Sequence, residues 1–442
     1  MQVLQRLLCI TLFGWLLCGA VAGQAQDLKS MVQAVYDDEL ADLFLYFHQN
    51  PELSTMEHKT SARLAAELEA LGYTVHRNVG GTGIVALLEN GEGPTVMFRA
   101  DMDGLPVEEK SGLEYASRAR QTDPNGNEVF VMHACGHDVH ITSLVGTAKI
   151  MADTRDQWQG TLMLIGQPAE ERVLGAAAMK ADDIWSRFGQ PDYAMAFHVT
   201  STMPTGYLGA SIESPYSGAD TVDIYIKGVG AHGASPHRGI DPIVLGSQIV
   251  LALQTVVSRN LPPRRPGVIT VGAFHSGTKH NIISDAAHLE LTVRSESAED
   301  RQLLLDGIRR VAENMGRVAG LPDDMLPEVV VSEESVPPTL NDEALTRQVI
   351  GLWDNYFGED YRFTGERLGM GAEDFPFFTV NPYIPSLYFA VGGTPAADFE
   401  REAAGGAPVP SHHSPLFKVE PEGSVTMGVE ASVTALRGLL AQ

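Results

Sequence analysis

The sequence predicts an α/β protein whose main domain, a mixed and largely parallel sheet flanked by helices, is interrupted by an inserted ferredoxin-like α+β domain. Apolar strand-like runs alternate with helix-like segments in the first half of the chain. From about Ser214 the order becomes strand, helix, two strands, helix, strand. After about Pro338 the first pattern resumes. At 442 residues the chain also exceeds the size of a typical single core, which favours two domains.

The first 25 residues have the pattern of a secretory signal peptide. Arg6 precedes an apolar run over residues 7–18, and small residues follow at Ala20, Ala22 and Ala25. The run is shorter than a membrane-spanning helix usually needs, which disfavours the alternative of a membrane anchor. We expect cleavage after Ala22 or Ala25, and a periplasmic or secreted protein without stable membrane insertion.

The main domain begins with a helix and four strands. Ser54 and Glu57 are spaced as a capping box for a helix that runs to about Leu71 and ends at Gly72. Another helix is expected from about Val139 to Ala152. Four runs are apolar enough for strands that are buried on both faces, and turn residues bound each of them. They are "GIVALLE" from Gly83, "TVMFRAD" from Thr95, "TLMLIGQ" from Thr161 and "DYAMAFH" from Asp192.

The inserted domain is marked by a change to period-two alternation, in "DTVDIYIKG". Helix-like segments follow at about 241–258 and 299–318. Between and after them lie the strand-like runs "GVITVGAFH", "AAHLELTVR" and "EVVVS". We therefore assign residues 26–213 and 338–442 to the main domain and residues 214–337 to the inserted one.

Charge and cysteine content narrow the classes of function. The chain has 31 basic and 56 acidic residues, a net charge of −25, which makes it an improbable partner for nucleic acid or an anionic membrane surface. Of its three cysteines, Cys9 and Cys18 lie in the predicted signal peptide. Cys135 remains as the one thiol of the mature chain, so an internal disulfide is excluded.

Polar side chains follow three of the predicted strands of the main domain. Asp101 and Asp103 come after one strand, Glu170 and Glu171 after another, and His198 ends a third. Ligands of open α/β sheets bind outside the carboxyl ends of the strands. We therefore expect these residues to converge on one site.

The segment "HACGHD" adds Cys135 and His137 to this group, and "SHHSP" adds His412 and His413 from far downstream. A thiolate, imidazoles and one carboxylate suit two transition-metal ions, while a second carboxylate stays free to handle water. Two alternatives remain at this point. Cys135 is a buried inert thiol, or it is a nucleophile that needs only one base and leaves the other residues unexplained.

Eight motifs, in order along nearly the whole mature chain, resemble the amidohydrolase branch of peptidase family M20, which includes hippurate hydrolases, N-acyl-amino-acid amidohydrolases and plant auxin-conjugate hydrolases. The motifs are "FRADMDGLPVEE" from Phe98, "MHACGHDVH" from Met132, "GQPAEE" from Gly166, "FHV" from Phe197, "GVGAHGASPH" from Gly228, "HNIIS" from His280, "MGAEDFPFF" from Met370 and "HHSPLF" from His412.

The resemblance implies two divalent transition-metal ions (zinc, manganese, cobalt or nickel) and a role for each matching residue. Glu170 matches the general base, which accepts a proton from water and delivers it to the leaving amine. Asp101 matches the aspartate that orients the metal site, and Arg99 stands where the wider family has a metal-binding histidine. The implied metal ligands are Cys135, His137, Glu171, His198 and His413.

The inserted domain resembles the lid of the family, which commonly carries the interface of a homodimer. His232 matches the lid histidine that polarises the substrate carbonyl, and Asn281 matches a lid residue that assists it. The implied reaction is hydrolysis of N-acyl or N-aroyl amino acids to a carboxylic acid and a free amino acid. Alternatives are a dipeptidase or carboxypeptidase that acts on peptides, and a non-catalytic metal-dependent binding protein.

Overall fold

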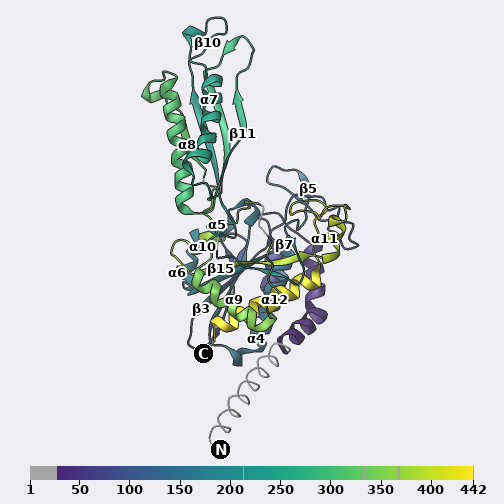
Figure 1. The fold of residues 1–442 in the computed structure, drawn as a ribbon. Coiled ribbons are helices and arrows are strands. Elements are labelled where there is room, and N and C mark those ends of the chain that lie inside the picture. Colours follow the sequence, from purple (N-terminus) through teal and green to yellow (C-terminus); the bar gives the residue numbers. More distant parts are fainter. Residues whose placement is uncertain (1–26, 213, 333, 366–368, 442) are drawn as a thin grey trace, which may run out of the picture. The chain divides into compact units, whose positions relative to one another are not determined.

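The computed structural model describes residues 27–212, 214–332, 334–365 and 369–441, and the contacts within the chain divide them into two units (Figure 1). The first unit contains residues 27–212, 341–365 and 378–441, and the second contains residues 214–332, 334–340 and 369–377. The predicted signal peptide, with Cys9 and Cys18, lies outside the described residues.

The first unit is built on a seven-stranded mixed sheet with the strand order β1-β2-β6-β3-β7-β15-β8. The four strands from β6 to β15 are parallel, whereas β1, β2 and β8 pair antiparallel at the two edges. The strands are β1 (Thr74–Val79), β2 (Gly83–Asn90), β3 (Thr95–Asp101), β6 (Gly160–Gln167), β7 (Tyr193–Pro204), β8 (Leu208–Gly209) and β15 (Ser386–Thr394), and a separate hairpin pairs β4 (Arg120–Thr122) with β5 (Glu128–Phe130).

Helices flank this sheet, as the sequence predicts. Helix α4 packs against β3 and β7, and it lies between α3 and α12, which in turn contacts α9 and β15. Apolar residues of these elements, such as Phe98, Leu144 and Phe197, form one continuous core. The helices are η1 (Tyr36–Leu40), α2 (Ala41–Gln49), α3 (His58–Ala70), α4 (His137–Asp153), η2 (Arg155–Gln157), η3 (Glu170–Arg172), α5 (Gly175–Ala181), α6 (Ile184–Phe188), α9 (Glu343–Phe357), α10 (Pro376–Thr379), α11 (Ala396–Ala403) and α12 (Pro421–Leu439).

The predicted capping box at the start of α3 is wrong. Glu57 is the N-cap residue, and no side chain caps the helix. Ser54 instead donates a hydrogen bond to the Asp103 carboxylate at 2.6 Å, and Glu57 accepts the backbone N–H of Ala169 at 2.8 Å. Both side chains therefore serve contacts with distant segments, which a local spacing rule does not detect.

The second unit is a four-stranded antiparallel sheet of order β11-β13-β9-β14, with α7 and α8 packed side by side against it. This is the predicted ferredoxin-like order of elements, so the fold class is confirmed. The elements are β9 (Gly218–Lys227), β10 (Ala231–His232), η4 (Pro236–Arg238), α7 (Pro242–Thr255), η5 (Val256–Asn260), β11 (Gly267–Ser276), β12 (Ile282–Ile283), β13 (Ala286–Ser295), α8 (Ala298–Val318), η6 (Asp323–Met325) and β14 (Glu328–Val331).

One helical segment of the second unit, Pro242–Asn260, is long and apolar enough to cross a membrane by length and composition alone. Its inner face, with Leu245, Ile249 and Leu253, is buried in the core of the unit. This packing accounts for part of its apolar character, as in the core helix of a globular domain.

Candidate active site

Three strands of the parallel part of the sheet deliver the acidic and imidazole side chains of the candidate site. The expectation that His198 ends its strand is wrong, because β7 continues along β15 to Pro204. Asp101 is the last residue of β3, and Glu170 and Glu171 open the short helix η3 that follows β6. His198 lies in β7, two residues beyond Ala196, the last residue of β7 that pairs with β3. All four lie at the carboxyl edge of the parallel strands, where open α/β sheets bind ligands.

The turn that carries Cys135 requires a glycine. Gly136 has a φ of 86°, in the left-handed region, and stands immediately before α4. A Cβ atom at this position would lie 2.4 Å from Cγ1 of Val199. This close approach of the turn to β7 brings Sγ of Cys135 to 3.4 Å from Nε2 of His198.

His137 has one ring nitrogen held and the other unpaired. Its Nδ1 donates to the backbone carbonyl of Asp103 at 2.8 Å, which leaves Nε2 for a ligand. Nε2 lies 3.9 Å from Oε2 of Glu170 and 4.0 Å from Oε1 of Glu171. Within the described part of the chain, neither this nitrogen nor Oε1 of Glu171 has a hydrogen-bond partner. Buried donor atoms that face one another in this way are typical of an ion site, and the backbone bond of Nδ1 is typical of a metal-binding histidine.

His413 reaches the same carboxylate from a distant part of the chain. Its backbone is in the left-handed region, with a φ of 65°, and its N–H donates to the carbonyl of Ala134 at 2.8 Å. Its Nε2 lies 3.3 Å from Oε2 of Glu171. The neighbouring His412 is used differently, because its Nε2 accepts the N–H of Ser201 at 3.1 Å. A non-glycine residue in a strained conformation is a recurring feature of functional sites.

Donor atoms from these residues gather in overlapping sets. In each set one donor atom per residue lies within 4.8 Å of the others, and the sets are Cys135 with His137 and His198, Cys135 with Glu171 and His413, and His137 with Glu170 and Glu171. The structure therefore brings together all five residues that the sequence assigns to metal, and Glu170 shares their space.

The thiol of Cys135 is buried among negative charges. Burial raises its pKa well above the ordinary value, and Glu171, Glu170 and Asp101 raise the pKa further. A thiolate at this position therefore needs a neighbouring positive charge. A divalent transition-metal ion supplies that charge and fits the thiolate, imidazole and carboxylate donors. The same surroundings disfavour a free cysteine nucleophile, which requires a lowered pKa.

Asp101 lies on the Nε2 side of His137 as an ionised carboxylate. Its Oδ2 accepts a hydrogen bond from Nη1 of Arg99 at 2.7 Å and lies 3.7 Å from Nε2 of His137. Although burial by itself raises the pKa of a carboxyl, the charges of His137, His140 and Arg99 hold the pKa of Asp101 well below its ordinary value. Arg99 is thus bound to the carboxylate and takes the place of a donor histidine.

Asp103, visible in the sequence only as a strand-end carboxylate without a role, organises the site. Its Oδ1 and Oδ2 accept the backbone N–H groups of Glu170 at 3.2 Å and Glu171 at 3.1 Å. Its own carbonyl holds His137, and Ser54 donates to its Oδ2. A spacing of Asp-x-Asp at a strand end does not reveal these partners, because they come from three other segments.

His232 and Asn281, the two residues that the resemblance assigns to the substrate, lie in the second unit. His232 is exposed in β10, which pairs with β12 directly after Asn281. The N–H of Gly233 donates to the carbonyl of Asn281 at 2.9 Å, so the two residues stand on adjoining segments. Nδ1 of His232 accepts the N–H of Ala234 at 3.0 Å.

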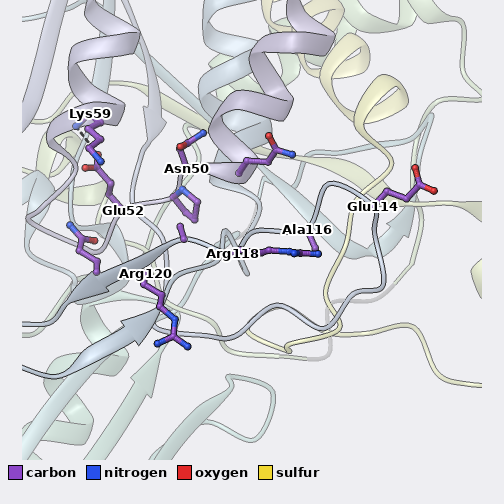
Figure 2. A pocket seen from close by; sticks show the side chains of 11 residues that line it. Asn50, Glu52, Lys59, Glu114, Ala116, Arg118 and Arg120 are labelled. Atoms are coloured by element: carbon purple, nitrogen blue, oxygen red, sulfur yellow. Dashed lines mark hydrogen bonds between the residues drawn. The ribbon is translucent and has the colours of Figure 1, made fainter.

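A pocket of about 530 Å³ on the first unit lies apart from these donor groups. Figure 2 shows it lined by charged side chains that include Glu52, Lys59, Glu114, Arg118 and Arg120. None of the candidate site residues lines it. This pocket is therefore distinct from the site at the strand ends.

Fold and donor set together define a metal-dependent hydrolase, and similarity to known proteins places it in a family. Residues 97–403 match the model of peptidase family M20/M25/M40, and the chain belongs to this family. This confirms the resemblance and the expectation of an enzyme.

Two relatives and one solved structure illustrate the similarity. The chain is 35% identical over 340 residues to the hippurate hydrolase of Campylobacter jejuni, which covers 75% of this chain and 82% of that protein. It is 34% identical over 371 residues to thermostable carboxypeptidase 2 of Saccharolobus solfataricus, with coverage of 83% and 88%. The structure of YxeP from Bacillus subtilis, described as a dinuclear metal-binding peptidase of family M20, is similar with a TM-score of 0.75 at 25% identity, covering 92% of this chain and 99% of that one.

Proposed function

We propose that this protein hydrolyses the amide bond of N-acyl or N-aroyl amino acids and releases a carboxylic acid and a free amino acid. The observation that carries this proposal is the convergence of five metal-type donors around Glu170 at the strand ends. The similarity to a hippurate hydrolase supports the substrate class, because hippurate is an N-aroyl amino acid. The residues that hold two divalent transition-metal ions in this proposal are Cys135, His137, Glu171, His198 and His413.

The donor set fits such ions because Nε2 of His137 and Oε1 of Glu171 are buried and have no hydrogen-bond partner among the residues that the structure describes. When bound, the ions polarise a carbonyl oxygen and lower the pKa of water. The protein holds its donors ready for them: the backbone fixes Nδ1 of His137, and Asp103 fixes the turn that carries Glu171.

Glu170 is the residue that moves the proton. Its backbone N–H is bound to Asp103, which holds the turn that carries it, and its Oε2 lies 3.9 Å from Nε2 of His137. As a carboxylate next to the reacting water, it accepts a proton and later delivers that proton to the leaving amine. Asp101, ionised 3.7 Å from Nε2 of His137, places a negative charge beside the metal ligands.

We also propose that His232 donates a hydrogen bond to the substrate carbonyl as the oxyanion develops, with Asn281 assisting it. The support is the match of both residues to the family motifs and the exposure of the His232 ring. His232→Ala is expected to lower kcat by about 10²–10³-fold, the typical cost of losing one such donor. An unchanged kcat with raised KM would assign His232 to ground-state binding instead.

A second candidate function is cleavage of peptides from their carboxyl end, which the similarity to a thermostable carboxypeptidase favours. Mass spectrometry of products from a panel of N-acyl amino acids and dipeptides, with enzyme reconstituted with metal, separates the two. Release of free amino acid from the N-acyl compounds at the higher kcat/KM supports our proposal. A clear preference for dipeptides would replace it with the peptidase function.

We further propose that the protein forms a homodimer through α7 and the edge strand β11 of the second unit. Apolar side chains stand exposed there at Ile243, Val244 and Phe274, and Leu251 is 72% exposed. Leu251→Asp is expected to shift the mass measured by light scattering toward a monomer. Val318→Asp, at an equally exposed valine on α8, is the matched control that leaves the mass unchanged.

Export after cleavage of the first 22 or 25 residues is the remaining part of the proposal. It is supported by the order of basic residue, apolar run and small residues in the sequence. Amino-terminal sequencing of the mature protein tests it: a chain that starts at Gly23 or Gln26 is expected, and an intact Met1 would contradict export.

A further inference from the structure

His140 lies behind the donor atoms and has both ring nitrogens engaged. It is in the first turn of α4, three residues after His137, and its side chain is buried. The backbone N–H of Val199 donates to its Nε2 at 2.8 Å. Because Nε2 accepts, the ring proton is on Nδ1, which donates to Oδ1 of Asp101 at 2.5 Å. The hydrogen-bond partners thus select the neutral tautomer of His140 with its proton on Nδ1.

The first of these two contacts leads to His198. Both backbone groups of Val199 are engaged. Its N–H, in the peptide bond that joins His198 to Val199, is bound to His140, and its carbonyl, in the following peptide bond, accepts a hydrogen bond from Nδ1 of His198 at 2.5 Å. With Nδ1 bound, Nε2 of His198 faces Sγ of Cys135 at 3.4 Å. His140 therefore holds the peptide plane between His198 and Val199, and the carbonyl of Val199 orients the His198 ring.

The second contact leads to His137. Oδ1 of Asp101 is bound by His140, and Oδ2 is bound by Arg99. Held on both oxygens, the carboxylate keeps Oδ2 at 3.7 Å from Nε2 of His137. The ring of His140 also stacks on that of His137, at 5.4 Å between centroids and 30° between planes.

We propose that His140 is a positioning residue of the metal centre, which as a neutral imidazole ties the Asp101 carboxylate to the peptide bond between His198 and Val199 and thereby positions His198. It binds no ion itself, because both of its nitrogens are used. This inference rests on the proposed function, since it assumes that Cys135, His137 and His198 hold metal. Replacement of a residue that orients a metal ligand through a hydrogen bond typically weakens metal binding by about 10–100-fold.

Three substitutions of His140 separate its two contacts. Leucine removes both. Asparagine places an amide N–H near the position of Nδ1 and keeps the donor to Asp101, but loses the acceptor for Val199. Glutamine reaches the position of Nε2 with its carbonyl and keeps the acceptor for Val199, but loses the donor to Asp101.

The measurement is cobalt(II) binding to the metal-free protein, followed by the thiolate-to-cobalt charge-transfer band of Cys135. His140→Leu is expected to weaken cobalt binding by about 10–100-fold and to shift the band. His140→Asn and His140→Gln are each expected to restore part of the affinity. Should His140→Leu not fold, the Asn and Gln variants still answer the question, since each is expected to bind cobalt more weakly than the wild type.

His133→Leu is the matched control, a second fully buried imidazole of the same segment whose ring nitrogens have no hydrogen-bond partner among the described residues. Its cobalt band and affinity are expected to match the wild type. A positioning role is overturned if the folded His140 variants keep the wild-type band and bind cobalt within twofold of it. A wild-type protein without any thiolate band, or one whose band survives Cys135→Ser, would instead overturn the proposed metal site.

Discussion

Two buried histidines at the first turn of α4 differ in the hydrogen-bond partners of their ring nitrogens. His137 belongs to this turn, and His48 contacts it through Asp138. His48, from α2, has both nitrogens against carboxylates: Nδ1 lies 2.7 Å from Asp138 and Nε2 lies 3.3 Å from Glu109. His137 has Nδ1 on a backbone carbonyl and Nε2 without a hydrogen-bond partner in the described residues. The fully paired ring joins three segments of the chain, whereas the half-paired ring remains available to a cation.

Carboxylates raise the pKa of both imidazoles, but the consequence differs between the two sites. Burial lowers the pKa of both, but hydrogen bonds to Asp138 and Glu109 raise the pKa of His48 to about 9. At His137 the charge of Asp101 and the hydrogen bond and charge of Asp103 raise the pKa to about 10. A proton completes the His48 cluster. At His137 a proton competes with a metal ion for the same negative charge, so the comparison separates a structural cluster from a functional one.

The largest expected effect is a loss of turnover at the candidate active site around His137, which is the functional cluster of this comparison. Glu170→Gln is expected to lower kcat by about 10²–10⁴-fold, the usual contribution of a positioned acid–base group, while the bound metal stays at the wild-type level. Turnover of an N-acyl amino acid and metal analysis by mass spectrometry measure the two quantities. A variant that keeps its turnover would remove Glu170 from the chemistry.

Loss of a donor from the same cluster is expected to act on metal first. Cys135→Ser is expected to raise the dissociation constant for metal by more than about 100-fold. That value is the upper end of the loss seen when a residue that only orients a metal ligand is replaced, and Cys135 is itself a ligand in our proposal. Equilibrium dialysis at controlled free zinc measures it, and chelation of the wild type reproduces the loss of activity. Full metal content in the variant, or wild-type activity that survives chelation but not alkylation of the thiol, would favour the nucleophile.

The structural cluster is expected to respond in stability instead. His48→Leu leaves Asp138 and Glu109 buried without their partner, and is expected to lower the free energy of unfolding by about 3–5 kcal/mol. Urea unfolding of the metal-free protein measures this change. Zinc affinity of the folded variant is expected to equal that of the wild type, and a parallel loss of affinity would show that the two clusters act as one.

The smallest effect is a pH dependence of stability that belongs to His48. Its pKa is raised on folding, so its contribution is complete below about 6.5 and is lost as the pH rises through about 9. The size of the shift sets an upper bound of about 3 kcal/mol on this loss. Urea unfolding at pH 6 and pH 10 is expected to show the difference between wild type and His48→Leu shrinking. A constant difference would assign the stabilisation to packing.

Much of the site was predictable because its polar residues directly follow apolar runs that have the pattern of buried strands. Asp101, Glu170 and His198 follow apolar runs that the sequence identifies as strands, and parallel strands deliver their ends to one edge. Cys135 and His137 sit at a helix start that the pattern of residues 139–152 also indicates. These inferences depend on local periodicity, which the sequence contains in full.

Asp103, His140 and the His48 cluster received no role from the sequence. Each acts through hydrogen bonds to segments far away in the chain, such as the bond between His140 and Val199, which are 59 positions apart. Local spacing also misassigned Ser54, which binds Asp103 rather than capping α3. Partners of this kind depend on which loops the packed sheet brings together.

Local periodicity and residue type therefore suffice for the fold class, the order of the motifs and the set of chemical groups that the sheet brings to one edge. The packing of the folded chain selects which nitrogen of each imidazole is used: Nε2 of His413 lies against the Glu171 carboxylate, and Nε2 of His412 accepts the N–H of Ser201. The partners of its two ring nitrogens decide whether a histidine binds metal, connects two other groups or stabilises a buried charge cluster. Those partners come from distant segments that only packing brings together.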